Sequence, residues 1–209
     1  RGHREEVVIV EMLKKVGIQF WGDQDEVMFA HGHCRGHRDG VCLGVLEAPK
    51  TPHLAEFKTM NDANFKDVIK SGVQVSKPGY YAQCQVYMQH FKLTRTLFVA
   101  INKNTDAAYF ERLRIDHKFA DSLERKAENI VLSELPPSKR FDPTWYECRW
   151  CSANKTCHGG EPVLKNCRTC QFIDIYPKGE WKCQKYDDLI LATGQQRLGC
   201  DKYKLLEGL

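Results

Sequence analysis

The stretch Leu54-Ala55-Glu56-Phe57-Lys58 follows the turn-rich segment 48–52 and alternates apolar with charged residues. This alternation predicts a short strand over residues 54–58. Because the side chains of a strand alternate between its two faces, Glu56 and Lys58 are expected to point the same way. A solvated strand face would show the same alternation, so other parts of the sequence must decide what this pair does.

Sixteen residues separate Glu56 from Asp39, which lies upstream in the segment Gly36-His37-Arg38-Asp39-Gly40. Two carboxylates can hold a hard divalent cation through their oxygens. Such a cation polarises a phosphoryl oxygen and helps to make hydroxide from water, and an ammonium at Lys58 would orient that water or stabilise the developing negative charge. An Asp before a Gly is also typical of a plain turn, but the ordered set of two acids and a base favours the metal ligand.

A third motif, Gln83-Cys84-Gln85-Val86-Tyr87, falls within a segment whose pattern predicts a helix over residues 78–91. Gln83 and Tyr87 are four residues apart and therefore share one face of that helix. They could simply belong to a helix face of mixed character. Alternatively, both project toward the metal site and a backbone phosphate.

Taken in order, Asp39, Glu56-x-Lys58 and Gln83-x-x-x-Tyr87 resemble the motifs of the PD-(D/E)XK nuclease superfamily and of its RecB-like branch. The segments 58–62 and 78–83 are similar to phage-type exonucleases of that branch, and the chain is also similar to the CRISPR-adaptation and AddB-type nuclease domains. The resemblance covers about residues 2–157. It implies that Asp39 and Glu56 bind Mg²⁺ or Mn²⁺, that Lys58 is catalytic, and that Gln83 and Tyr87 support the site and the substrate.

The resemblance also implies a metal ligand on the first helix, with His3 as the first candidate and Glu6, one turn later, as the runner-up. Three histidines precede Asp39, and they either contact metal or phosphate or are exposed on a strand; they are His31, His33 and His37, of which His37 is the best placed. Basic residues near the predicted site could contact phosphates, although ordinary solvated charges would look the same. They are Lys66, Lys70, Lys77, Lys92 and Arg95.

The periodicity of the sequence predicts an α/β fold. Helices are expected over residues 2–16, 62–70, 78–91 and 119–132, and strands over 27–30, 35–45, 54–58, 97–101 and 108–115. The resemblance implies a restriction-endonuclease-like core, in which helices flank a central mixed sheet with the active site at one end. We expect two domains, a nuclease core over residues 1–135 and a small Cys-rich metal-binding region over residues 136–209, which begins with a proline-rich linker.

The 209 residues and 42% hydrophobic content suffice for one catalytic domain with an appendage. No run of eighteen apolar residues and no secretory signal is present, which predicts a protein without a membrane span. With the resemblance, this predicts a cytoplasmic protein of a bacterial host, encoded by a phage or prophage. The net charge of +4 suits a DNA partner but is shared by many unrelated domains. Because the chain begins inside a predicted helix, we expect further residues upstream.

Seven of the ten cysteines lie between Cys148 and Cys200. Tightly spaced Cys-x-x-Cys pairs in such a chain indicate an intracellular metal-binding protein and not a disulfide scaffold. Thiolates favour zinc or an iron–sulfur cluster. The second group predicts a self-contained four-cysteine zinc site with a structural role; its members are Cys167, Cys170, Cys183 and Cys200.

The first group, Cys148, Cys151 and Cys157, is followed directly by His158. Its spacing resembles the Cys-x-x-Cys-x5-Cys ending of RecB-like nucleases that hold a 4Fe-4S cluster and take a fourth cysteine from far upstream. No cysteine precedes His3 in this chain. Either His158 completes a zinc site of three cysteines and one histidine, or residues upstream of Arg1 supply the fourth cysteine of an iron–sulfur cluster.

Together these features predict a metal-dependent deoxyribonuclease, most simply an exonuclease or end-processing enzyme, whose partners are DNA and possible replication or recombination proteins. The alternative is a non-catalytic, zinc-dependent nucleic-acid-binding module built on an inactive nuclease-like core. A redox protein is the least supported prediction, because neither Cys-x-x-Cys pair has a thioredoxin-like strand-to-helix context. Nothing in the sequence indicates the oligomeric state.

Overall fold

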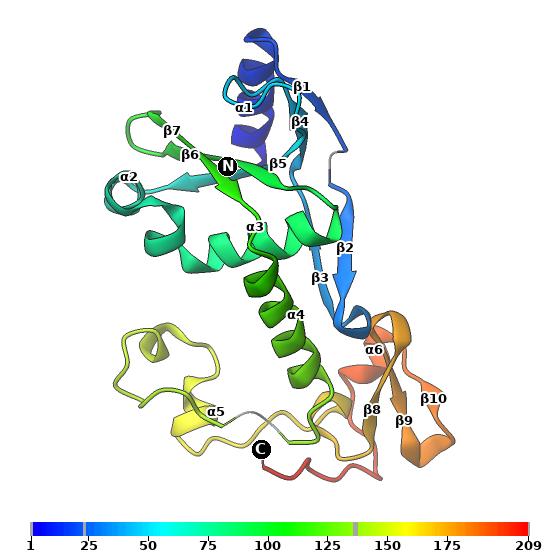
Figure 1. Ribbon diagram of the computed structural model, residues 1–209. Coiled ribbons are helices and arrows are strands. Elements are labelled where there is room, and N and C mark those ends of the chain that lie inside the picture. The colour runs from blue at the N-terminus through cyan, green and yellow to red at the C-terminus, as the bar shows by residue number, and fades with distance from the viewer. Residues whose placement is uncertain (1, 23, 136–137, 209) are drawn as a thin grey trace. The chain divides into compact units, whose positions relative to one another are not determined.

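The structure is a computed structural model that describes residues 2–22, 24–135 and 138–208, without the side chains of residues 2 and 3 (Figure 1). The described chain forms two compact units. The first contains residues 1–28 and 35–126, and the second contains residues 29–34 and 127–209. The predicted division of function at residue 135 stays a prediction. In the described parts of the chain, no helix is long and apolar enough to cross a membrane.

A five-stranded mixed sheet is the centre of the first unit, as predicted. Its strands run in the spatial order β1 (Gln19–Trp21), β4 (Gly40–Leu43), β5 (His53–Met60), β6 (Arg95–Asn102) and β7 (Ala108–Arg114). Only β5 and β6 are parallel to each other, and the other neighbours are antiparallel. The short strand β1 was not predicted, because three residues are too few to show a periodicity.

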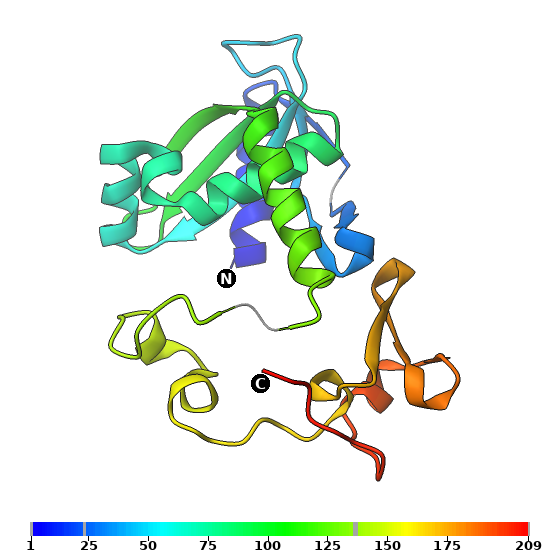
Figure 2. The same cartoon turned by 60° about the horizontal axis from the view of Figure 1, so that its bottom comes forward.

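Helices cover both faces of this sheet (Figure 2). On one face, α1 (Gly2–Lys15) buries Ile9 and Leu13 against a core that includes Ala55, Phe57 and Val99. On the other face, α2 (Asp62–Ser76) and α3 (Pro78–His90) pack against β5 and β6. Because β5 alternates its side chains, Phe57 points into the α1 core while Glu56 and Lys58 belong to the opposite face. The fourth helix, α4 (His117–Val131), follows β7.

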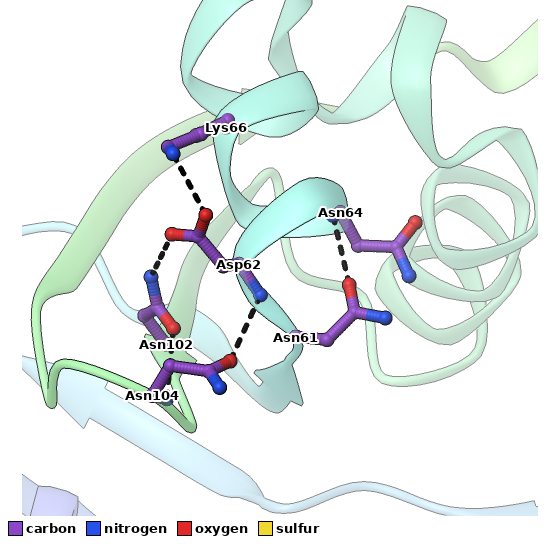
Figure 3. Close-up of polar contacts among 6 residues, drawn as sticks. All are labelled: Asn61, Asp62, Asn64, Lys66, Asn102 and Asn104. Atoms are coloured by element: carbon purple, nitrogen blue, oxygen red, sulfur yellow. Dashed lines mark hydrogen bonds and ion pairs between the residues drawn. The ribbon is translucent and has the colours of Figure 1, made fainter.

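A polar network fixes the end of the parallel strand pair to the start of α2 (Figure 3). Asn61 caps the helix, since its Oδ1 accepts a hydrogen bond from the Asn64 amide at 2.9 Å. Asp62 accepts from Asn102 Nδ2 at 3.1 Å and pairs with Lys66 at 2.7 Å, while its own amide donates to Asn104 Oδ1 at 3.1 Å. These contacts hold the β6–β7 turn against the helix that leaves β5.

Two predicted boundaries are wrong. The helix predicted over residues 62–70 continues to Ser76 with a kink at Gly72. Gly72 adopts φ 70°, and the Val73 amide donates to Glu111 Oε2 at 2.8 Å instead of to the helix. The strand predicted over residues 35–45 is interrupted at Arg38 and Asp39, which separate β3 (Cys34–His37) from β4.

Strand β3 pairs with β2 (Glu26–Phe29) in a hairpin whose tip, residues 29–34, is part of the second unit. That unit also contains a three-stranded sheet in the order β10 (Leu189–Ile190), β9 (Glu180–Cys183) and β8 (Ile173–Tyr176), with the short helices α5 (Asn154–His158) and α6 (Thr193–Gln196). Few of its described apolar side chains are buried, Cys170 and Leu191 among them. A core this small needs additional cross-links to be stable.

Candidate active site

Asp39, directly before β4, lies beside Glu56 of the neighbouring strand β5. The antiparallel register places Gly40 opposite Ala55, which puts Asp39 level with Glu56. The Asp39 Oδ2 atom accepts a hydrogen bond from the Phe57 backbone amide at 2.7 Å. The structure thus brings together the two acids that the sequence paired across sixteen residues.

Glu56 is fully buried. Its Oε1 accepts a hydrogen bond from Lys58 Nζ, whereas its Oε2 has no hydrogen-bond partner among the described residues. Burial raises the pKa of Glu56 from its ordinary value of 4.5 to about 7; the charges of Asp39 and Glu6 add to the rise, and Lys58 opposes it. The anionic form therefore lacks sufficient positive charge and hydrogen bonding around it.

Lys58 lies between Glu56 and an aromatic ring. Its ammonium pairs with Glu56 and sits 5.1 Å from the centre of the Tyr80 ring. Burial alone would lower the pKa of Lys58, but the Glu56 and Asp39 charges outweigh it and the pKa is raised. Lys58 is therefore a cation and a hydrogen-bond donor at neutral pH, not a base. Tyr80 stands three residues before Gln83 and so shares its helix face, which is the one signal in the sequence for its place here.

Tyr87 and Gln83 both face inward from α3. Tyr87 is buried and hydrogen-bonded to Gln83, and burial together with the negative charge of Glu56 raises its pKa. Its hydroxyl lies against β3: a Cβ atom placed on Gly36 would be 1.9 Å from Tyr87 Oη. The pair therefore connects the helix to the strand that leads into Asp39, three residues after Gly36.

Two hollows open beside these residues, and Glu6 of α1 lines both. One, of about 240 Å³, is also bordered by Asp39 and Phe57. The other, of about 250 Å³, is bordered by Lys58 and Tyr80. Glu6, the runner-up of the sequence analysis, is thus placed at the site. His3 belongs to α1, but its side chain lies outside the described residues, so its role stays a prediction.

Two of the three histidines before Asp39, His31 and His33, contact residues of the second unit. His31 lies 3.5 Å from Glu128, and His33 Nε2 lies 3.2 Å from the Tyr176 carbonyl oxygen with its ring edge-on to Trp181. All these residues belong to the second unit, and metal or phosphate contact by His31 and His33 stays a prediction. Strand β3 separates His31 and His33 from Asp39 along the chain.

Several of the predicted phosphate contacts are engaged in the fold. Lys66 pairs with Asp62 at 2.7 Å and Lys77 pairs with Asp67 at 3.0 Å, which ties both lysines to α2. The Arg95 guanidinium donates to the Thr94 carbonyl oxygen at 2.8 Å. These contacts satisfy the charges locally and leave phosphate binding by the basic group a prediction.

Arg38, next to Asp39, is a residue that the sequence analysis missed. Its side chain is 11% exposed, pairs with Asp25, donates from Nε to the Gly22 carbonyl oxygen at 3.1 Å and lies 3.9 Å from the centre of the Phe91 ring. It therefore anchors the backbone immediately before Asp39 to β1–β2 on one side and to the end of α3 on the other. An arginine before an acid carries no sequence signal of burial, so only the structure shows this anchor.

The first cysteine group is gathered in space. Cys148 Sγ lies 3.9 Å from His158 Nε2. Burial and then the negative charges of Cys151 and Cys157 raise the pKa of Cys148. Cys148 thus lies near His158, and Cys151 and Cys157 lie near enough to affect its charge.

The four cysteines of the second group line one small cavity of about 20 Å³, enough for a single water-sized group. Burial and then the charges of Cys200, Cys170 and Cys183 raise the pKa of Cys167, so the four thiols repel one another when ionised. Within the described residues, no three His, Cys, Asp or Glu side chains are already arranged to hold an ion together. Coordination by either group would thus require the thiols to move closer together.

Comparisons with known proteins give a limited result. No protein-family model matches the chain, and no curated protein matches it. The crystal structure of LHK-Exo in complex with dAMP matches with a TM-score of 0.47 and 18% identity, covering 61% of this chain and 62% of that one. SSO0001 matches with a TM-score of 0.45 and 19% identity, covering 77% of this chain and 70% of that one. The chain thus spans less than two thirds of the length of LHK-Exo, and similarity at this level concerns the path of the backbone and not its chemistry.

Proposed function

We propose that the first unit hydrolyses phosphodiester bonds of DNA with the help of a divalent metal ion. One observation carries the proposal: a fully buried carboxylate, Glu56, keeps one oxygen without a hydrogen-bond partner among the described residues and lies beside Asp39 and Lys58. A purely structural carboxylate in the centre of a sheet would be expected to have both oxygens satisfied. Two acids and a fixed ammonium form the minimum set for this chemistry.

The donor set fits Mg²⁺ or Mn²⁺. Glu56 Oε2 and the Asp39 carboxylate offer hard oxygen ligands from adjacent strands, and Glu6 borders the hollow next to them. His3 is a further candidate ligand on the same helix. When bound, such an ion would supply charge stabilisation and a water of lowered pKa.

Four side chains near the two acids have the remaining roles in the proposed reaction. Lys58, protonated and held by Glu56, is placed to donate a hydrogen bond to the attacking water or to a phosphoryl oxygen. Tyr87 and Gln83 hold each other and lie against the strand that presents Asp39, so they position the acid and donate toward the substrate. Tyr80 forms one wall of the hollow beside Lys58, where it limits the motion of the ammonium.

The same proposal includes a finer prediction. The protein would be an exonuclease or end-processing enzyme of phage or prophage type that works with replication or recombination proteins in a bacterial cytoplasm. This prediction rests on the motif resemblance alone. We also infer that Cys167, Cys170, Cys183 and Cys200 bind structural zinc, and that Cys148, Cys151, Cys157 and His158 bind a second zinc. The nearness of His158 to Cys148 favours zinc over a 4Fe-4S cluster at the latter site.

A cleavage time course with Mn²⁺ on linear and covalently closed circular DNA tests the proposal. We expect Asp39→Asn, Glu56→Gln and Lys58→Ala to lose at least about a hundredfold in rate. The matched control is Glu47→Gln, which removes a carboxylate that is 61% exposed and should cleave like the unaltered chain. Loss of only the linear substrate indicates an end-dependent enzyme, and cutting of the circle indicates an endonuclease. Cleavage that survives in folded Glu56→Gln, or DNA retention without turnover by the unaltered chain, would overturn the proposal; the latter would favour the binding module.

A further inference from the structure

Four aromatic residues lie within ten positions of the second unit, and the rings of the first three are in contact: Phe141, Trp145, Tyr146 and Trp150. The Phe141 and Trp145 rings are stacked almost parallel, with centroids 5.0 Å apart and an interplanar angle of 7°. The Tyr146 ring follows at 5.1 Å from Trp145, inclined by 51°. We call these four residues the aromatic patch.

The aromatic patch is exposed although its members are large and apolar. Trp145 is 41% exposed, Tyr146 is 61% exposed and Trp150 is 87% exposed. Single exposed aromatic residues are common, but a contiguous group is typical of an interaction surface. Trp150 lies in the one-turn helix Cys148–Trp150 of the first cysteine group, so the local backbone that presents this ring is the one that the proposed zinc would hold.

Hydrogen bonds hold the Trp145 and Tyr146 rings by their edges. Trp145 Nε1 donates to Glu147 Oε2 at 3.3 Å, and Tyr146 Oη donates to Glu147 Oε1 at 3.2 Å. Asp142 stabilises the turn before Trp145, because its Oδ1 accepts hydrogen bonds from the amide and the hydroxyl of Thr144 at 2.8 and 2.6 Å. The two acids of this segment are thus occupied at the ring edges and in the turn. The faces of Tyr146 and Trp150 remain the accessible part.

Three cationic residues lie within or next to the segment that carries the aromatic patch. The Arg140 guanidinium lies 5.0 Å from the centre of the Phe141 ring, Lys139 precedes it, and Arg149 is adjacent to Trp150. In the part of the chain that the structure describes, none of these three residues forms an ion pair with an acidic side chain, and all three are exposed. Their charges are therefore available to a partner that carries negative charge.

We propose that the aromatic patch binds single-stranded DNA, with unpaired bases stacked on Trp150 and Tyr146 and backbone phosphates paired with Arg149, Arg140 and Lys139. Open ring faces next to unpaired cations match the alternation of flat bases and phosphates along a single strand. In a duplex the base faces are buried in the stack, so the rings would have nothing to contact. The inference extends the proposed function, because it assigns a single-stranded segment as the part of the substrate that the second unit holds.

Binding is measured without cleavage, using the full chain with no added divalent ion and no chelator. The probe is a fluorescein-labelled oligo-dT of about twenty nucleotides, followed by anisotropy and by quenching of tryptophan fluorescence. We expect Trp150→Ala to raise Kd by about 5- to 150-fold, as stacking of one to a few bases is lost. Arg149→Ala should lower the slope of log K against log salt by about 0.7, the value for one phosphate contact on a single strand.

The matched control is Phe110→Ala, which removes an aromatic ring that is 53% exposed on β7 and should leave Kd unchanged. Trp150→Tyr should restore most of the affinity, because a ring face is restored. Two results would overturn the inference: Trp150→Ala and Tyr146→Ala both bind within twofold of the unaltered chain, or a duplex of the same length binds as tightly as the single strand. A chain that binds oligo-dT through the patch but never cleaves DNA keeps the inference and removes the proposed function. Cleavage with patch-independent binding does the reverse.

Discussion

Gly36 offers a sharp test of how the site is assembled. An added Cβ would lie 1.9 Å from Tyr87 Oη and 2.9 Å from the ring carbon that carries it. Ordinary contact begins at 3.4 Å, so Gly36→Ala makes this approach about 1.5 Å too short. Tyr87 cannot swing away freely, because its ring is buried and its hydroxyl is hydrogen-bonded to Gln83.

Either the Tyr87 ring or strand β3 must therefore move. Overpacking of this kind costs about 1–3 kcal/mol of unfolding free energy. Movement of β3 is transmitted to Asp39, three residues on, and a displacement of about 1 Å at a catalytic group can cost about a hundredfold in rate. We expect Gly36→Ala to lower both the unfolding free energy and the cleavage rate. The cleavage rate should fall by more than the decrease in the amount of folded protein.

Urea unfolding and initial cleavage rates, measured on the same preparations, test this expectation in a double-mutant cycle with Tyr87→Phe. Removing the hydroxyl relieves the closest contact, so Gly36→Ala should cost less in the Tyr87→Phe background by about 0.5 kcal/mol or more. Gly79→Ala is the control, because a Cβ there meets nothing within 4 Å. An equal cost of Gly36→Ala in both backgrounds, or none in either, would refute the packing argument.

Three further predictions concern charge and metal. Because the pKa of Glu56 is raised to about 7, the folded chain holds a proton that the unfolded chain releases near pH 4.5. The metal-free protein should therefore lose about 3 kcal/mol of unfolding free energy as the pH rises from about 4.5 to about 7. Urea unfolding at several pH values measures this loss, which Glu56→Gln should not show. Arg38→Lys should destabilise the first unit by about 1–3 kcal/mol and weaken Mn²⁺ binding in calorimetry, since lysine cannot hold the Gly22 carbonyl, Asp25 and the Phe91 ring together. The control is Arg35→Lys, which alters an ion pair whose arginine side chain is 46% exposed. It should change neither the stability nor the Mn²⁺ affinity. Cys183→Ser should lower the zinc content by about one ion per chain in elemental analysis, whereas Cys34→Ser should keep it, and equal zinc in both variants would contradict the four-cysteine site.

The parts of the site that depend on local geometry could be predicted from the sequence. Glu56 and Lys58 share a face because a strand has a period of two, and Gln83 and Tyr87 share a face because a helix brings residues four apart together. The pairing of Asp39 with Glu56 is not local. It arises from the β4–β5 register, and the sequence indicated it only through the order of the motifs.

The parts that the sequence could not predict depend on long-range contacts. From the sequence, Arg38 looks like an ordinary exposed charge. Its burial depends on contact with the ring of Phe91, which lies fifty-three residues later in the chain. The helix boundary at Gly72 was missed because a side chain on β7, Glu111, accepts the amide that the kink releases. The exposure of Trp150 likewise depends on a turn within the cysteine group and on no periodicity.

The opposing faces of β5 explain how the first unit tolerates Glu56. Phe57 packs with Ile9 and Leu13 in an apolar core, so one face of the strand contributes burial of hydrophobic side chains. The other face carries a buried carboxylate with a raised pKa and an oxygen that no described group satisfies, which reduces stability. An apolar residue at position 56 would give a more stable protein, because replacing a buried ion pair with hydrophobic residues is often neutral or stabilising in other proteins. In the proposed function, a divalent cation held by the two acids offsets this cost. We therefore expect Glu56→Gln to fold well and to cleave poorly.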